Sequence, residues 1–89
     1  MSTTDQATFT TALCEFIRTS VSVGNPPIEP ETDLVMTGYV DSLGIVLVVE
    51  WIETQLDIMI DPGDVVIEDF ESVAAMVAYL GRRDDVTFS

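Results

Sequence analysis

Few side chains in this sequence can do chemistry, and Ser42 stands out among them. It follows Asp41 in the segment Gly38-Tyr39-Val40-Asp41-Ser42-Leu43, and a long apolar stretch comes directly after it. A serine nucleophile needs a base to take its proton. The chain contains no histidine and no lysine, so it lacks the usual nitrogen bases. We therefore expect Ser42 to be modified by another protein and not to act as a catalyst itself.

The other reactive side chains indicate no catalytic centre. Cys14 lies beside the predicted buried face of a helix, where an inert core thiol is the common case. No two carboxylates are predicted to converge in an apolar pocket, as general acid–base catalysis requires. Two acidic clusters, within residues 61–64 and 68–71, lack the ordered spacing of a calcium loop. We predict neither an enzyme nor a metal site.

The charge balance restricts the partners. Sixteen acidic residues face three arginines, which gives a formal net charge of −13. Nucleic acid is excluded as a partner, because phosphate binding needs clusters of lysine and arginine. The acidic surface favours proteins with basic docking surfaces and speeds encounter with them. For many of the acidic residues, solubility is a sufficient explanation.

Length and apolar content describe one small domain. The chain has 89 residues, of which 47% are hydrophobic, enough for a single core. We assign residues 1–89 to one domain, with a folded core over about 5–83 and a loose tail at 84–89. No apolar run reaches the ~18 residues of a membrane span, and residues 1–5 do not resemble a secretory signal. With a single cysteine and no sign of export, we expect a cytoplasmic monomer.

Two elements must precede Ser42 and position it. The capping pattern Thr3-x-x-Gln6 and a helical apolar periodicity predict a first helix over about 5–22, which residues 24–27 end. Residues 28–40 then form a loop, and a loop of this length in a small domain is often functional. Gly38 would let this loop turn closely. The side chains that could pin the loop to the core are Leu34, Val35, Met36 and Val40.

The second helix carries Ser42 at its start. It is predicted from Asp41 or Ser42 to Leu56, with either of the first two residues as its cap. A serine in this place lies at the positive end of the helix dipole, where an anion attached to its oxygen would be stabilised. The stripe that we assign to the core consists of Ile45, Val48, Val49, Ile52 and Leu56.

The opposite side of the second helix predicts a surface for partners. A helix that is apolar nearly all round is either deeply buried or keeps an apolar face for partners. Leu47 and Trp51 lie on the flank, and for Leu47 burial under the long loop is an alternative. The outward stripe consists of Leu43, Val46, Glu50 and Glu53.

The last third of the chain completes a helical fold. A short helix is predicted over about 62–67, after Asp61 as its cap, and a last helix over about 72–83, capped by Asp69 or Ser72. We therefore predict an all-α four-helix bundle, with three main helices, one short helix and a long first loop. The buried face of the last helix is predicted to be Val73, Met76, Val77 and Leu80.

Several of these segments together resemble a known family. Asp41-Ser42-Leu43, preceded by Gly38 and followed by Val46-x-x-Val49-Glu50, is similar to the attachment motif of the acyl carrier protein family. The segment from Leu56 to Pro62 and the start of the last helix at 69–73 resemble the family's later elements. The resemblance covers roughly residues 34 to 80.

This resemblance implies a function in transport of acyl groups. A phosphopantetheinyl transferase would attach 4′-phosphopantetheine from coenzyme A to Ser42 with the help of magnesium, and Asp41 would serve that transferase. The terminal thiol would then carry an acyl or aminoacyl group as a thioester. By the family pattern, loading and processing enzymes would contact Leu43, Val46 and Glu50, with Leu47 and Glu53 beside them.

Some residues depart from the fatty-acid type of carrier. Leu47 stands where an acid is common, and Gly44 after Leu43 resembles small stand-alone carriers of specialised pathways. Gly44 also weakens the first turn of the helix by about 1 kcal/mol relative to alanine. A dedicated pathway that makes a modified fatty acid, a polyketide or a nonribosomal peptide is therefore favoured. The alternative is an unmodified interaction module that docks partners through the apolar face of the second helix.

Overall fold

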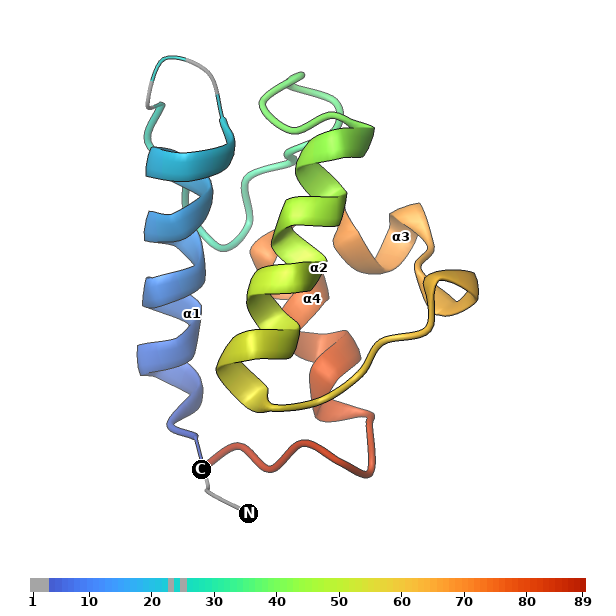
Figure 1. Cartoon of the computed structure of the whole chain (residues 1–89). Coiled ribbons are helices and arrows are strands. Elements are labelled where there is room, and N and C mark those ends of the chain that lie inside the picture. The colour runs from blue at the N-terminus through green and yellow to red at the C-terminus, as the bar shows by residue number, and fades with distance from the viewer. Residues whose placement is uncertain (1–3, 23, 25) are drawn as a thin grey trace.

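The apolar periodicities of the chain become four α-helices in the computed structural model, which describes residues 4–22, 24 and 26–89 (Figure 1). The helix α1 continues into a π-helical turn, η1, and a 3-10 turn, η2, precedes α3. The predicted all-α four-helix bundle, with three main helices and a short one, is confirmed. The bounds are α1 Gln6–Phe16, η1 Ile17–Val21, α2 Ser42–Leu56, η2 Pro62–Asp64, α3 Ile67–Phe70 and α4 Val73–Gly81.

The first helix begins with a different cap from the predicted one. Asp5 is the N-cap of α1, and its Oδ2 accepts a hydrogen bond of 2.9 Å from the backbone N–H of Thr8. Thr3, the cap that the sequence pattern predicted, lies outside the described residues. The predicted extent of about 5–22 agrees with α1 and η1 taken together. The π-helical geometry of the last turn was not predicted.

The long loop is fixed to the core at two of its apolar residues. Leu34 and Val40 are buried, and the N–H of Leu34 donates a 2.7 Å hydrogen bond to the carbonyl of Glu71, before α4. The prediction that Met36 also fixes the loop to the core was wrong, because Met36 is 84% exposed. Val35 is only partly buried. The loop therefore lies across the start of α4 and holds Val40, the residue that directly precedes Asp41.

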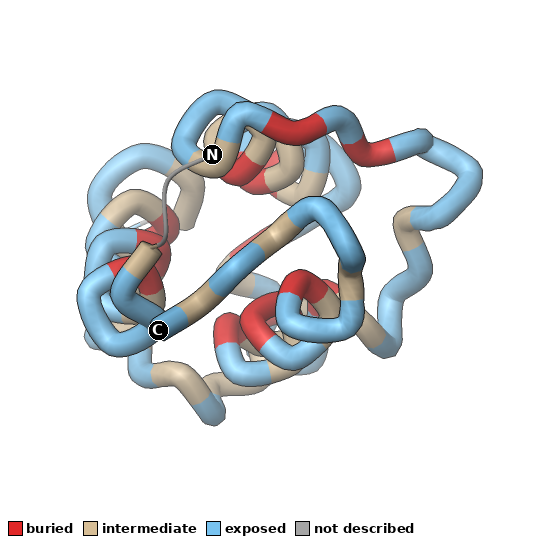
Figure 2. The backbone as a smooth tube through the Cα atoms, turned by 90° about the horizontal axis from the view of Figure 1, so that it is seen from below, coloured by how far each residue is buried: buried red, intermediate tan, exposed pale blue. Residues whose placement is uncertain are grey.

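The core lies between α1, α2 and α4, with exposed residues on the outer side of each helix (Figure 2). The predicted buried face of α4 is confirmed. On α2, Val48 and Ile52 are fully buried, and the other members of the predicted stripe are partly buried. Trp51 lies at the edge of this core, where its ring stacks on Phe16 with 5.1 Å between the centroids. None of the described helices is long and apolar enough to cross a membrane.

The prediction of a short helix over 62–67 was wrong in its position, because α3 spans Ile67–Phe70. The chain forms the 3-10 turn η2 instead, then an extended pair at Val65 and Val66, and only then α3. Gly63 and the β-branched valines explain the difference, because both disfavour a continuous α-helix. Phe70, at the end of α3, is 1% exposed and anchors α3 to the core.

The expected loose tail is instead bonded to the start of α1. Thr4 and Phe88 form an isolated parallel bridge, and the N–H of Ser89 donates a 2.9 Å hydrogen bond to the carbonyl of Thr4. The ring of Phe88 packs on Phe9, with 5.5 Å between the centroids. The C-terminal end of the chain therefore lies beside the beginning of α1 (Figure 1).

Candidate functional site

Ser42 lies in the open, at the first position of α2. It is exposed, at the end of the molecule where the long loop reaches the helix (Figure 1). Backbone N–H groups in the first turn of a helix lack helical acceptors, and the helix dipole is positive there. The position therefore gives a visiting enzyme access to the hydroxyl and favours a negative group attached to it.

Asp41 caps the helix that carries Ser42. Its backbone is extended, and its Oδ1 accepts a 2.9 Å hydrogen bond from the N–H of Gly44. Its carbonyl accepts the first helical hydrogen bond, from Ile45 at 3.0 Å. Of the two predicted caps, Asp41 is the one that the structure shows. Because Ser42 does not cap the helix, its hydroxyl is not committed to that role.

The loop before the site turns at Gly38. Its φ of +77° lies in the left-handed region, which glycine adopts without strain. Val40 is buried immediately after this turn, with its N–H bonded to the carbonyl of Leu34 at 3.1 Å. The turn at Gly38 and the anchor at Val40 together direct the chain into Asp41, and this agrees with the role predicted for the glycine.

The outward face of α2 is exposed along its first turns. Leu43 is 68% exposed, Val46 51% and Leu47 39%, so the alternative of Leu47 buried under the loop is not the one observed. Glu50 is exposed one turn further along. Four of the predicted contact residues therefore share an accessible surface beside Ser42, although nothing in the structure places a partner on it.

Glu53 has a different position from the rest of that surface. It is only partly exposed, and its Oε2 accepts a 2.7 Å hydrogen bond from the backbone N–H of Ile60. Its carbonyl also accepts from the N–H of Ile58, at 3.2 Å. The carboxylate thus fastens the segment after α2 back onto the helix. This internal role was not evident from the sequence, since the partner lies seven residues away.

An apolar groove of about 610 Å³ begins at Ser42 and follows α2. Val46, Val49 and Glu50 form its wall on the α2 side, and residues of the segment 59–67 with Phe70 form the opposite wall. Sequence reasoning did not find this groove, because its second wall depends on how the segment between α2 and α4 folds. The groove places a largely apolar surface next to the exposed hydroxyl.

The environment of Cys14, the single cysteine, lowers its reactivity. Burial raises the pKa of the Cys14 thiol, and the acidic side chains of Glu31, Glu15 and Glu29 raise it further. A thiol with a raised pKa is a poor nucleophile at neutral pH. Within residues 4–22, 24 and 26–89, no group of three or more possible metal ligands comes together.

A comparison with protein families identifies the class to which this arrangement belongs. The sequence model of the phosphopantetheine attachment site matches residues 11–80, most of the chain. The chain belongs to this family of phosphopantetheine-carrying proteins, and its fold is that of the acyl carrier protein bundle. Comparisons with curated proteins and with solved structures found no match.

The residues at the start of α2 fit the family's covalent group, 4′-phosphopantetheine. The attachment needs a reachable hydroxyl, and Ser42 is exposed. A phosphodiester there would lie at the positive end of α2, where it would be stabilised. The group supplies a terminal thiol that carries an acyl chain as a thioester.

Proposed function

We propose that this protein is a stand-alone acyl carrier, modified at Ser42, which presents its cargo to the enzymes of a specialised lipid, polyketide or nonribosomal peptide pathway. One observation supports it above the others: the model of a phosphopantetheine attachment site matches a chain whose Asp41-Ser42-Leu43 segment is exposed at the start of α2. We place this function in the cytoplasm, where coenzyme A and the transferase would be available.

In the proposed modification, Ser42 Oγ forms a bond to the phosphorus next to the pantetheine arm of coenzyme A. The bond between the two phosphates of coenzyme A breaks, and the nucleotide half leaves. The proton of Ser42 passes to a base of the phosphopantetheinyl transferase, since this chain has no histidine or lysine. Asp41 would help the incoming enzyme hold its magnesium ion. Its Oδ1 would continue to cap α2 through the N–H of Gly44.

We further propose that the exposed face of α2 guides the partner enzymes. Leu43, Val46 and Leu47 offer apolar contact, and Glu50 offers a charge to a basic docking surface. We leave Glu53 as an edge of that surface only, because its carboxylate is bonded to the N–H of Ile60. The net charge of −13 would speed the encounter with basic partners.

The apolar groove favours a cargo with an apolar chain over a charged one. Its walls carry aliphatic side chains and Phe70, and its rim includes Ser42. An apolar chain that enters the groove would bury surface and stabilise the fold by about 0.8 kcal/mol per buried CH₂. The melting temperature of the acylated protein should therefore rise with acyl length over short chains. Equal melting temperatures for acetyl and octanoyl forms would contradict this.

Intact mass spectrometry tests the modification itself. After incubation with coenzyme A, magnesium and a broad-specificity transferase, the protein should gain the mass of one phosphopantetheinyl group. Ser42→Ala should abolish the gain. Ser72→Ala is the matched control, because Ser72 also stands at the start of a helix, where its Oγ accepts from the N–H of Ala75 at 3.0 Å. That variant should still be modified.

The result that contradicts the proposal is a folded wild-type protein that gains no mass with several transferases. An unmodified interaction module, the alternative function, predicts in addition that Ser42→Ala keeps full biological activity in the native host. A carrier predicts that this variant loses it completely.

A further inference from the structure

Gly44 is packed more closely than its place in an exposed helical turn would suggest. It is buried, whereas Ser42 and Leu43 just before it are exposed. A Cβ added at Gly44 would lie 2.8 Å from Cγ1 of Val21 and 2.8 Å from Cγ1 of Val40. Non-bonded carbon atoms keep about 3.5–4.0 Å between them, so a side chain here would displace its neighbours. The start of α2 thus touches both the end of η1 and the long loop.

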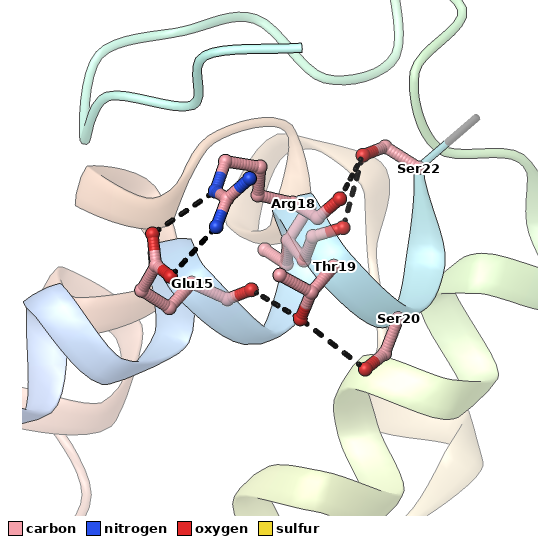
Figure 3. A network of polar contacts seen from close by, with 6 residues as sticks. Glu15, Arg18, Thr19, Ser20 and Ser22 are labelled. Atoms are coloured by element: carbon pink, nitrogen blue, oxygen red, sulfur yellow. Dashed lines mark hydrogen bonds and ion pairs between the residues drawn. The ribbon is translucent and has the colours of Figure 1, made fainter. Parts of the chain in front are cut away.

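The π-helical turn η1 brings Val21 to this contact. The N–H of Ser22 donates to the carbonyl of Ile17 at 2.8 Å, five residues back, which is the π pattern. The Ser22 hydroxyl donates to the same carbonyl at 3.0 Å and lies 3.2 Å from that of Arg18 (Figure 3). Such turns are rare and often occur at functional sites. Here the turn ends the first helix against α2.

The contact of Gly44 with Val21 and Val40 is connected to Ser42 in two ways. The N–H of Gly44 bonds to Oδ1 of Asp41 at 2.9 Å, so Gly44 and the cap move together. Ser42 lies between these two residues in the chain. Val40, the other neighbour of Gly44, is the residue just before the cap. A displacement of Gly44 would therefore move the turn that carries Ser42.

We propose that Val21 and Gly44 are positioning residues for the modification of Ser42. Their contact holds the first turn of α2 against η1, and this fixes where the hydroxyl lies when a transferase docks. The inference rests on the proposed function. Group transfer is sensitive to alignment, and a displacement of the order of 1 Å at a reacting atom costs up to about 10²-fold in rate.

The test is the rate of phosphopantetheinyl transfer to Gly44→Ala, measured by intact mass at a temperature where circular dichroism shows the protein folded. We expect kcat to fall about tenfold, with a smaller change in KM, because the docking face further along α2 is unaltered. Gly81→Ala is the matched control: this glycine ends α4, and an added Cβ would meet nothing within 4 Å. It should leave kcat unchanged.

The double variant Val21→Ala/Gly44→Ala separates positioning from stability. It nearly conserves the volume across the contact, so it should recover part of the kcat that Gly44→Ala loses. A purely structural contact would change the melting temperature of these variants and leave kcat of the folded protein at the wild-type value. That outcome, or a double variant no faster than Gly44→Ala, would overturn the inference while wild-type modification still supports the carrier function.

A second comparison decides the question if Gly44→Ala does not fold. Val21→Ala should lower kcat, whereas Val86→Ala, which alters a partly buried valine of the C-terminal segment, should not. Equal kcat values for these two variants would overturn the inference. A wild-type protein that no transferase modifies would refute both this inference and the proposed function.

Discussion

Asp41 offers the sharpest test, because its carboxylate has one role in the fold and one in the proposed function. In the fold, Oδ1 accepts a 2.9 Å hydrogen bond from the N–H of Gly44 and caps α2. In the proposed function, the same side chain serves the transferase. Asparagine keeps an oxygen that can cap the helix, whereas alanine does not. Both substitutions remove the same single charge, so their difference isolates the cap.

The usual cost of a lost N-cap gives the size of the expected effect. Loss of an N-cap costs about 1 kcal/mol, and 1 kcal/mol lowers the melting temperature of a domain of this size by about 4–8 °C. We therefore expect Asp41→Ala to melt about 4–8 °C below Asp41→Asn. Asp41→Asn should melt close to wild type, since the weaker dipole interaction is offset by less repulsion among the acids.

Two assays on the same samples complete this test. Thermal melts by far-ultraviolet circular dichroism report the cap, and the rate of phosphopantetheinyl transfer reports the charge. We expect Asp41→Asn to be modified slowly although it is folded. Asp5→Ala is the control, because Asp5 caps α1 through the N–H of Thr8. The start of α1 lies at the opposite end of the bundle from the start of α2 (Figure 1). The Asp5→Ala variant should melt at a lower temperature than wild type and be modified at the wild-type rate.

Equal melting temperatures for the alanine and asparagine variants would refute the reasoning about the cap. A wild-type rate of modification in Asp41→Asn would refute the role of the charge.

Three further predictions concern stability. Moderate salt or divalent cations should raise the melting temperature, because they screen the repulsion within a chain of net charge −13; a melt that does not depend on salt would contradict this. Phe88→Ala should cost about 1–2 kcal/mol and shift the fluorescence of Trp51 toward that of an exposed indole, since Phe88 covers Phe9 beside Trp51; an unchanged melt and spectrum would mean that the C-terminal segment contributes nothing. Glu53→Ala should lose about 1–3 kcal/mol in urea unfolding, since it leaves the N–H of Ile60 without its acceptor, whereas Glu53→Gln should lose less; equal losses would show that the hydrogen bond is unimportant.

Local patterns made much of the bundle predictable. The buried face of α4 and the extent of α2 followed from apolar spacing, because a helix repeats every 3.6 residues whatever surrounds it. The turn at Gly38 followed from the chemistry of a single residue. For the cap of α4 the sequence left two candidates, Asp69 and Ser72, and the structure shows Ser72. The same local logic failed at α3, where two valines extend the chain before Phe70 buries its ring.

The sequence by itself determined that Ser42 starts a helix, that an acid precedes it, and that the chain has no histidine or lysine to activate it. Such facts depend only on neighbours in the chain. Tertiary structure alone decided that Gly44 touches Val21, that Glu53 holds the N–H of Ile60, and that a groove opens beside Ser42. Each of these contacts joins segments that no local rule relates, because packing of the helices sets the distances between them.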